Sequence, residues 1–289
     1  GDSMEQILEK IYLIAGDHHK YQYRTLLICT IFWTFSNVLP SCLPFLESMP
    51  MGDLYMNNDT SYYEHNIQLN YTVCDNPNAR FEITSVPEFS ISYYFDFFCN
   101  PALVSLLGIS IFAGGSVGSL MLQGVADHIG KTSSFIVAIT LIAISIVLVT
   151  YQINYYFIFP LFFFIQMFTI ILSYSAITNI AETSSSKHRP IFISLVNTGY
   201  SLCGLIFTWI FYLGGTWRTA LYIAGGIMIF FSLMYLRFTV QSPRFFVAIG
   251  NYPQFYKSVR YIAKLNNRWE ITKKILPVYK KQVERFETP

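Results

Sequence analysis

The residues of this chain that could do chemistry are charged side chains at the ends of long apolar stretches. The clearest are Asp127, Lys131, Glu182, Arg189 and Arg244. Opposite charges at neighbouring helix ends can pair, and each also interacts with a helix dipole. The sequence therefore predicts a charge network at one membrane face. The alternative is that each side chain reaches from its helix end toward water.

Inside the apolar stretches the polar and aromatic side chains carry no charge. Six of them are candidates for lining a solute path: Trp33, Asn37, Gln166, Asn179, Asn197 and Tyr200. The faces of Trp and Tyr rings attract quaternary ammonium cations. The alternative is hydrogen bonding between helices, and for any single residue we favour that alternative.

Other kinds of chemistry have no pattern in the sequence. It contains no Gly-rich phosphate loop, HExxH or CxxC motif, and no apolar stretch offers a nucleophile with a base or a metal-ligand cluster. The net charge is only +2. We therefore expect no enzyme activity, no cofactor, no metal and no nucleic-acid partner.

Hydrophobic residues make up 53% of the chain and charged residues 12%, which is typical of a membrane protein rather than a soluble domain. A helix needs about 20 apolar residues to cross a bilayer. The sequence predicts an all-α membrane protein with six spans: Leu26–Leu46, Pro101–Val125, Phe135–Tyr151, Tyr155–Ile180, Ile191–Leu213 and Thr219–Phe238.

The basic residues predict the orientation of these spans. Of the 19 Lys and Arg residues, all but Arg80 and Arg218 lie on the side that holds both termini. Because Lys and Arg are retained in the cytoplasm during insertion, we expect both termini to be cytoplasmic.

The loop at residues 47–100 is the one long segment expected on the opposite side. It contains Cys74 and Cys99, which can form a disulfide, and two glycosylation sequons at Asn58 and Asn70. Both modifications require a secretory compartment. We therefore favour the plasma membrane or an endomembrane. The mitochondrial inner membrane is the alternative, and there the sequons would stay unused.

The two ends of the chain are predicted to form surface helices. Residues 4–15 carry one apolar face, a helix is expected to start near Asn251, and another covers residues 270–285. Such helices lie against a membrane, whose lipids are natural partners. The expected segments are an N-terminal helix at 1–25, the first span at 26–46, the loop at 47–100, spans two to six at 101–240 and a helical tail at 241–289.

Several motifs in order resemble the major facilitator superfamily, and within it the organic cation, anion and carnitine transporters of solute carrier family 22. The matching residues are Gly118-Ser119-Leu120, Ala126 to Lys131, Glu182 with Arg189, Tyr212 with Trp217-Arg218, Ser242-Pro243-Arg244, Gly250 and Asn266. The resemblance implies the N-terminal half of a transporter that alternates access to a small organic solute. It also implies that the charge network closes the cytoplasmic side, and that the tail helices join this half to a second one.

The sequence also departs from the family pattern. His128, Thr132 and Gln123 replace expected motif residues, Gln241 replaces a Glu, and Gln166 lies in the stretch where many superfamily members have an intramembrane Arg. No charged residue lies well inside a predicted span. Two alternatives to a complete transporter therefore stay open. One is a transport-inactive half that serves as an accessory subunit of a larger membrane complex. The other is a half-size transporter that works with a second copy or a separate partner.

Overall fold

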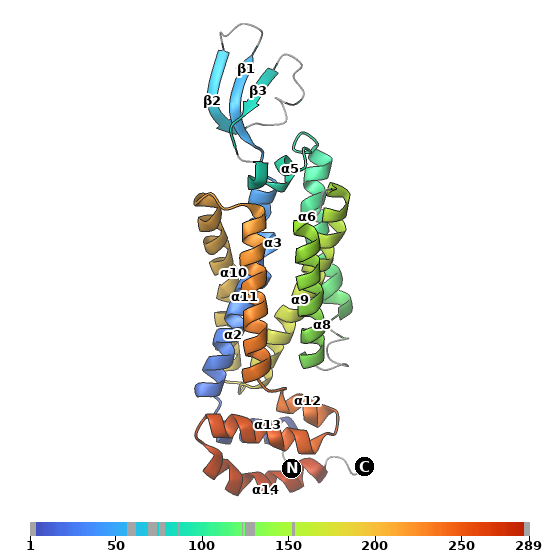
Figure 1. Ribbon diagram of the computed structural model, residues 1–289. Coiled ribbons are helices and arrows are strands. Elements are labelled where there is room, and N and C mark those ends of the chain that lie inside the picture. The colour runs from blue at the N-terminus through green and yellow to red at the C-terminus, as the bar shows by residue number, and fades with distance from the viewer. Residues whose placement is uncertain are drawn as a thin grey trace.

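The chain is built in three layers along one axis, as Figure 1 shows: a small sheet, a bundle of long helices, and a layer of crosswise helices at both termini. The structure is a computed structural model that describes residues 4–56, 62–68, 74, 79–85, 87–122, 124, 131–151 and 154–285. Both ends of the described chain lie in the crosswise layer. We call that side of the bundle the termini side.

The bundle confirms the predicted membrane fold. Within the described residues, six helical segments are long and apolar enough to cross a membrane. They are α2 (Lys20–Ser36) with α3 (Val38–Leu46), α6 (Pro101–Val117) with the π-helix η2 (Gly118–Leu122), α8 (Lys131–Thr150), η3 (Tyr155–Phe157) with α9 (Ile158–Glu182), α10 (Arg189–Tyr212) and α11 (Trp217–Phe238).

The helix ends differ from the predicted span ends mainly on the termini side. The first spanning helix, α2, begins at Lys20, six residues before Leu26, and α9 continues to Glu182. Tyr21 and Gln22 are fully buried there. The extra turn of α2 carries polar residues that contact the crosswise layer, as Tyr21 and Gln22 do at Asn266.

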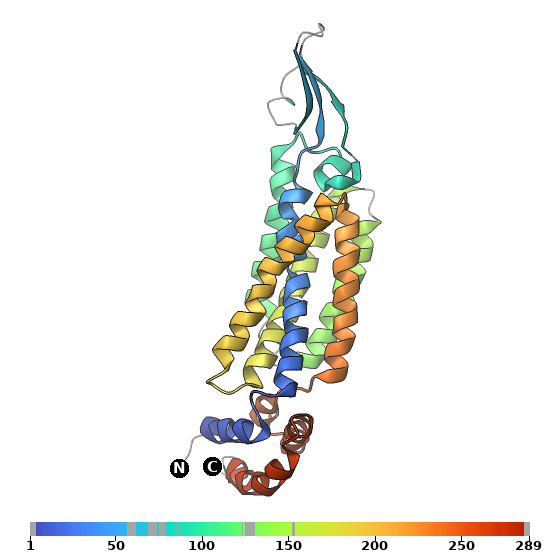
Figure 2. The same cartoon turned by 90° about the vertical axis from the view of Figure 1, so that its left-hand side faces the viewer.

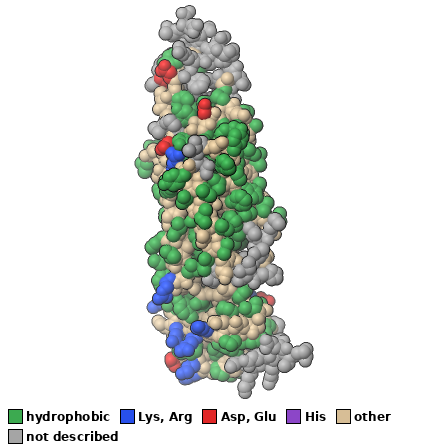
Figure 3. All heavy atoms as spheres, turned by 45° about the vertical axis from the view of Figure 1, so that its right-hand side comes forward, with side chains coloured by type: hydrophobic (Ala, Val, Ile, Leu, Met, Phe, Trp, Pro, Cys, Tyr) green, Lys and Arg blue, Asp and Glu red, His purple; other side chains and the backbone are tan. Residues whose placement is uncertain are grey.

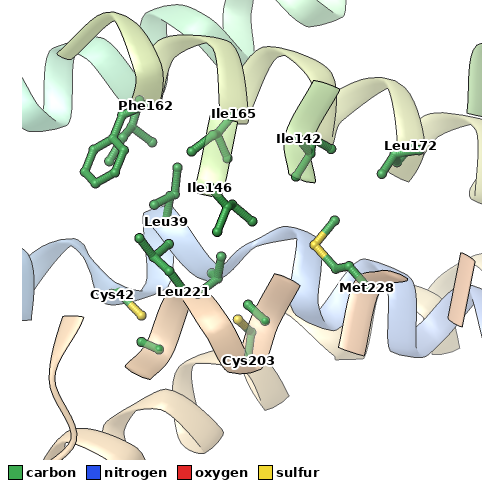
Figure 4. Packing of buried hydrophobic residues seen from close by; sticks show 14 of the residues in the cluster. Leu39, Cys42, Ile142, Ile146, Phe162, Ile165, Leu172, Cys203, Leu221 and Met228 are labelled. Atoms are coloured by element: carbon green, nitrogen blue, oxygen red, sulfur yellow. The ribbon is translucent and has the colours of Figure 1, made fainter. Parts of the chain in front are cut away.

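An apolar core fills the centre of the bundle. Figure 4 shows Leu39 of α3 among Ile146 of α8, Phe162 and Ile165 of α9, and Leu221 of α11. The outward faces are apolar as well, and Figure 3 shows hydrophobic side chains over much of the mid-height surface. A helix that is apolar on its core side and on its outer side suits a lipid environment.

Helices α6 and α9 approach closely because glycines lie between them. A Cβ atom added at Gly118 would lie 2.6 Å from the carbonyl oxygen of Met167, and one at Gly114 would overlap the backbone of Phe163. Small residues allow this kind of backbone approach in membranes. The contact fixes α6 and the start of η2 against α9.

The long loop adds a small antiparallel sheet to the predicted helical fold. Strands β1 (Met51–Met56), β2 (Tyr62–Gln68) and β3 (Ala79–Ile83) lie in the order β2-β1-β3. The short turns η1 (Pro87–Phe89) and α5 (Ile91–Tyr94) lead back to the bundle. Strands this short carry little periodic signal, and each one needs its neighbours before its backbone groups are paired.

A disulfide links Cys74 to Cys99, the pair expected from the sequence, with their Cα atoms 5.6 Å apart. It connects the segment after β2 to the residues just before α6. The two sequon residues, Asn58 and Asn70, lie outside the described residues.

The crosswise layer consists of α1 (Met4–Ala15), α12 (Pro243–Ala248), α13 (Tyr252–Leu265) and α14 (Trp269–Arg285). In Figure 2 these helices lie below the bundle and run across its axis. A second apolar cluster holds them together, with Ile7 and Ile11 of α1 packed with Phe255 and Val259 of α13. The first and last segments of the chain thus share one core.

Candidate functional site

The predicted charge network falls partly within the described structure. Asp127 lies outside the described residues, and only the backbone of Lys131 is described. The other three candidates lie at the termini side of the bundle. Glu182 ends α9, Arg189 begins α10, and Arg244 lies in the first turn of α12.

The Tyr12 side chain is buried in the crosswise layer, where Arg244 lies over its ring and the charge of Glu182 also acts on it. The Arg244 guanidinium carbon lies 5.6 Å from the centre of the Tyr12 ring, and Nη1 lies 3.5 Å from Oε1 of Glu5. Burial is the main reason that the pKa of Tyr12 lies well above its ordinary value. The charge of Arg244 lowers that pKa and the charge of Glu182 raises it. The two predicted network charges therefore act on one buried group.

Arg189 lies at the same end of the bundle and contacts the end of α9. Its Nε donates a hydrogen bond to the carbonyl oxygen of Ala181, at 3.0 Å. A cation there is favourable, because the C-terminal carbonyl groups of a helix carry partial negative charge. Arg189 thus lies beside the backbone that presents Glu182.

A buried hydrogen-bond network centres on Asn266 at the end of α13. Its Oδ1 accepts from the Tyr21 backbone N–H at 2.9 Å, and its Nδ2 donates to the Gly16 carbonyl at 2.6 Å and to Gln22 Oε1 at 3.2 Å. Gln22 Nε2 in turn donates to the carbonyl of Thr183 at 3.2 Å. One chain of hydrogen bonds therefore joins α13, the start of α2 and the turn after α9.

A second cluster on the termini side was not predicted from the sequence. Nδ1 of His188 lies 2.9 Å from Oδ2 of Asp17, Ser185 Oγ donates to the same oxygen, and the His188 ring stacks on His18 with centroids 4.6 Å apart. Burial alone would raise the pKa of Asp17, but hydrogen bonds from Ser185 and His188 and the charge of His188 outweigh it. The pKa of Asp17 therefore lies below its ordinary value.

The opposite end of the bundle has its own polar contact, centred on Arg218 at the start of α11. Its Nη1 donates to Glu88 Oε1 at 2.7 Å, and its Nη2 donates to the Tyr94 hydroxyl at 2.7 Å. The guanidinium also lies 4.4 Å from the centre of the Tyr94 ring. Arg218 thereby holds η1 and α5, the two turns that follow the sheet, against the start of α11.

Among the path candidates, the asparagines on the inner helices are hydrogen-bonded within the protein. Asn37 Nδ2 donates to the carbonyl of Trp33 at 2.6 Å, and Asn179 Nδ2 donates to the Tyr235 hydroxyl at 2.8 Å. Asn179 is 2% exposed, so it links α9 to α11 in the core. The Asn179 bond is the interhelical bonding of the alternative, whereas the Asn37 bond is local to the end of α2. Asn179 Oδ1 has no hydrogen-bond partner among the described residues.

The remaining path candidates fall into two groups. Gln166 is 4% exposed on α9, and its Oε1 has no hydrogen-bond partner among the described residues. Nε1 of Trp33 also has no hydrogen-bond partner among the described residues. Trp33 lies on α2, the helix that packs beside α9. Asn197 and Tyr200, in contrast, are exposed on the outer face of α10. The six candidates thus divide between the bundle interior and one outer face.

A small hollow of about 150 Å³ opens between α8 and α11. Its lining is apolar and includes Ile142, Ile146, Gly225 and Met228. None of the six path candidates lines it.

These observations define a multi-pass membrane protein with a six-span bundle and a crosswise helical layer. The sequence matches the Major Facilitator Superfamily over residues 81–276, more than half of the chain, and the chain belongs to this superfamily. The superfamily consists of membrane transporters, which are typically not enzymes, and six spans correspond to half of its fold. The comparison with curated proteins finds no match to this chain.

Proposed function

We propose that the chain is the N-terminal half of a transporter of small organic solutes, which alternates access to the two sides of the membrane together with a second helical bundle. Membership of the superfamily and the six-span fold support this proposal. In such transporters the solute binds near the middle of the membrane, between two bundles that rock around it.

The observation that carries the proposal is that path candidates on α2 and α9 have buried polar atoms without a partner among the described residues, namely Trp33 Nε1, Gln166 Oε1 and Asn179 Oδ1. Nearly all buried polar atoms in proteins have a partner, so an exception calls for a functional reason or a bound molecule. Gln166 Oε1 and Trp33 Nε1 are an acceptor and a donor without a partner among the described residues. A bound solute or water molecule could supply the hydrogen-bond partners that both atoms need.

The outer face of α10 supports contact with a second bundle. Exposed Ser194, Asn197, Ser201 and Thr208 form one polar stripe beside exposed apolar residues of α10, whereas the exposed residues at the middle of α8 are mainly Ile, Val and Leu. Polar side chains are costly against lipid tails. We infer that α10 faces the second bundle, supplied by the same polypeptide or by a partner subunit, and that Asn197 and Tyr200 face the solute path.

We propose an organic cation or zwitterion as the solute. The motifs shared with the organic cation, anion and carnitine transporters support this class. No Asp, Glu, Lys or Arg lies well inside a described span. Recognition would therefore depend on aromatic faces such as those of Trp33 and Tyr200, which attract quaternary ammonium groups.

The test is uptake of radiolabelled tetraethylammonium by cells or proteoliposomes that contain the full polypeptide. We expect Gln166→Leu to lower uptake at least about tenfold, because one good polar contact is worth about 1.4 kcal/mol or more. The matched control is Thr140→Val, which also removes a polar group from a span. Its hydroxyl is exposed on α8 and bonds its own helix at Ile136. Equal uptake by both variants and the unmodified protein would contradict the role of Gln166.

The second candidate is a transport-inactive accessory subunit of a larger membrane complex. The hydrogen bonds donated by the amide nitrogens of Asn37 and Asn179 favour it, because donors engaged within the protein are not available to a solute. This candidate predicts no saturable uptake by the unmodified protein. It also predicts that Asn197→Leu with Ser201→Leu releases a co-purifying membrane partner, while the matched pair Ile136→Leu with Val147→Leu on α8 does not.

A further inference from the structure

Helix α13 is a basic amphipathic helix that lies directly under the bundle. It contains Lys257, Arg260 and Lys264 and no Asp or Glu. All three basic residues are exposed, as is Arg237 in the last turn of α11. The described acidic side chains of α1 and α14, such as Glu5 and Glu270, belong to other helices of the layer. Figure 3 shows Lys and Arg side chains gathered at this end of the molecule, below the apolar surface of the spans.

Contacts of Tyr261 show which side of α13 faces the membrane. Its hydroxyl donates to the carbonyl of Phe238, the last residue of α11, at 3.4 Å, and lies 3.3 Å from Nη2 of Arg24 at the base of α2. The Tyr261 side of α13 therefore faces the ends of two membrane spans.

Lys257 and Lys264 are the neighbours of Tyr261 on the helix surface, four residues before it and three after it. Arg237 immediately precedes Phe238, to whose carbonyl Tyr261 donates. Three exposed cations thus border the point where α13 meets the end of a span. A span ends where lipid tails give way to headgroups, so these cations lie at headgroup depth.

We propose that Arg237, Lys257 and Lys264 form a binding surface for the headgroups of anionic phospholipids in the leaflet on the termini side. Positive charge at the membrane boundary is complementary to anionic lipid, and each Lys or Arg there contributes to the attraction. Basic residues are retained on the cytoplasmic side, whose leaflet is the anionic one. The surface is independent of solute transport and would exist in either candidate function.

The test is native mass spectrometry of the delipidated full polypeptide titrated with an equimolar mixture of dioleoylphosphatidylglycerol and dioleoylphosphatidylcholine. We expect the unmodified protein to bind the anionic lipid preferentially. The double variant Lys257→Gln with Lys264→Gln should bind it about 30-fold more weakly, because each charge contributes about a factor of five.

The matched control is Lys273→Gln with Lys274→Gln on α14. It removes the same charge from exposed positions of the same layer, but α14 lies farther from the bundle in Figures 1 and 2. The control should keep the preference for anionic lipid. Equal loss in both double variants, or no lipid preference in the unmodified protein, would overturn the proposal.

Two further measurements complete the test. A single variant replaces the double variant if that one fails to fold, and competition with inorganic phosphate distinguishes a lipid surface from a site for soluble anions. Arg237→Gln alone should weaken binding about fivefold, and an unchanged affinity would count against the surface. Inorganic phosphate at millimolar concentration should leave lipid binding intact. Complete displacement by phosphate would show a site for soluble anions instead.

Discussion

Asn266 caps a helix at Tyr21, a residue that lies 245 positions earlier in the chain. Its Oδ1 accepts from the backbone N–H of Tyr21, in the first turn of α2, where His19 supplies no side-chain cap. The first N–H groups of a helix have no partner inside the helix. The cap of the first membrane span is therefore supplied from the crosswise layer. The two layers are locked together at that point.

Asn266→Ala is expected to lower the free energy of unfolding by about 2–3 kcal/mol, because it leaves the Tyr21 N–H and the Gly16 carbonyl buried without partners. Asn266→Asp keeps the acceptor for Tyr21 and removes the Nδ2 donor. Comparison of the two variants therefore separates the contribution of the Tyr21 hydrogen bond from that of the Nδ2 hydrogen bonds. Reversible unfolding in detergent measures both. Gln254→Ala, at an exposed position of α13, should change stability by less than about 0.5 kcal/mol.

Gly114→Ala is expected to destabilise the bundle by about 1–3 kcal/mol, because the new Cβ would overlap the backbone of Phe163 on α9. Gly226→Ala is the matched control on α11, where nothing lies within 4 Å of an added Cβ. It should be neutral or stabilising by up to about 1 kcal/mol, since alanine favours helix. Similar effects of the two substitutions in a thermal unfolding assay would argue against the close approach of α6 and α9.

The disulfide predicts how many cysteines react with a maleimide mass tag. Of five cysteines in the chain, Cys29, Cys42 and Cys203 are free and buried. Three tags should be added to the denatured protein without reductant and five after reduction.

Cys74→Ser with Cys99→Ser should destabilise the loop by about 3–4 kcal/mol, as expected for a closed loop with a separation of 25 residues. Hydrogen exchange of the sheet measures this loss. Five tags on the denatured protein without reductant would contradict the disulfide.

Arg218 and Glu88 are expected to be coupled by about 1 kcal/mol in a double-mutant cycle with Arg218→Gln and Glu88→Gln. The contact is short, and Arg218 also donates to Tyr94. The pair of Arg244 with Glu5 is the comparison, because its atoms are 3.5 Å apart and the Glu5 side chain is 69% exposed. Its coupling should be close to zero. Equal coupling of both pairs would show that the Arg218 contact is an ordinary surface ion pair.

The lowered pKa of Asp17 predicts that the protein loses stability at acidic pH. This pKa is lower in the folded protein than in the unfolded chain, where it is about 3.9. The contribution of Asp17 to stability is therefore present above about pH 4 and is lost as the pH falls through the lower folded value. Unfolding of the unmodified protein and of Asp17→Asn, followed from pH 6 to pH 3, should give curves that converge at the acidic end. A constant difference between the two curves would show that the ionisation of Asp17 does not contribute.

The sequence by itself determined the membrane class and the number of spans, because these depend only on the length and polarity of each stretch. The two cysteines of the loop also indicated their disulfide, since few alternatives were available. Superfamily membership likewise follows from the sequence alone. The predicted ends of the spans differ from the helix ends, as at Lys20. Polarity marks where an apolar stretch ends, but a helix can continue beyond it through polar residues.

Only the tertiary structure decided how the polar residues are used. Gln22, Asp17, His188 and Glu88 carried no pattern that indicated a role, and the motif that contains Asn266 did not indicate its partner at Tyr21. Each of these contacts joins segments far apart in the chain, and a hydrogen bond forms only where the packing of whole helices brings donor and acceptor together. The sheet has the same origin, because its strands gain their backbone partners only from one another. Local polarity specifies the spans, whereas the approach of distant segments specifies the contacts between the layers.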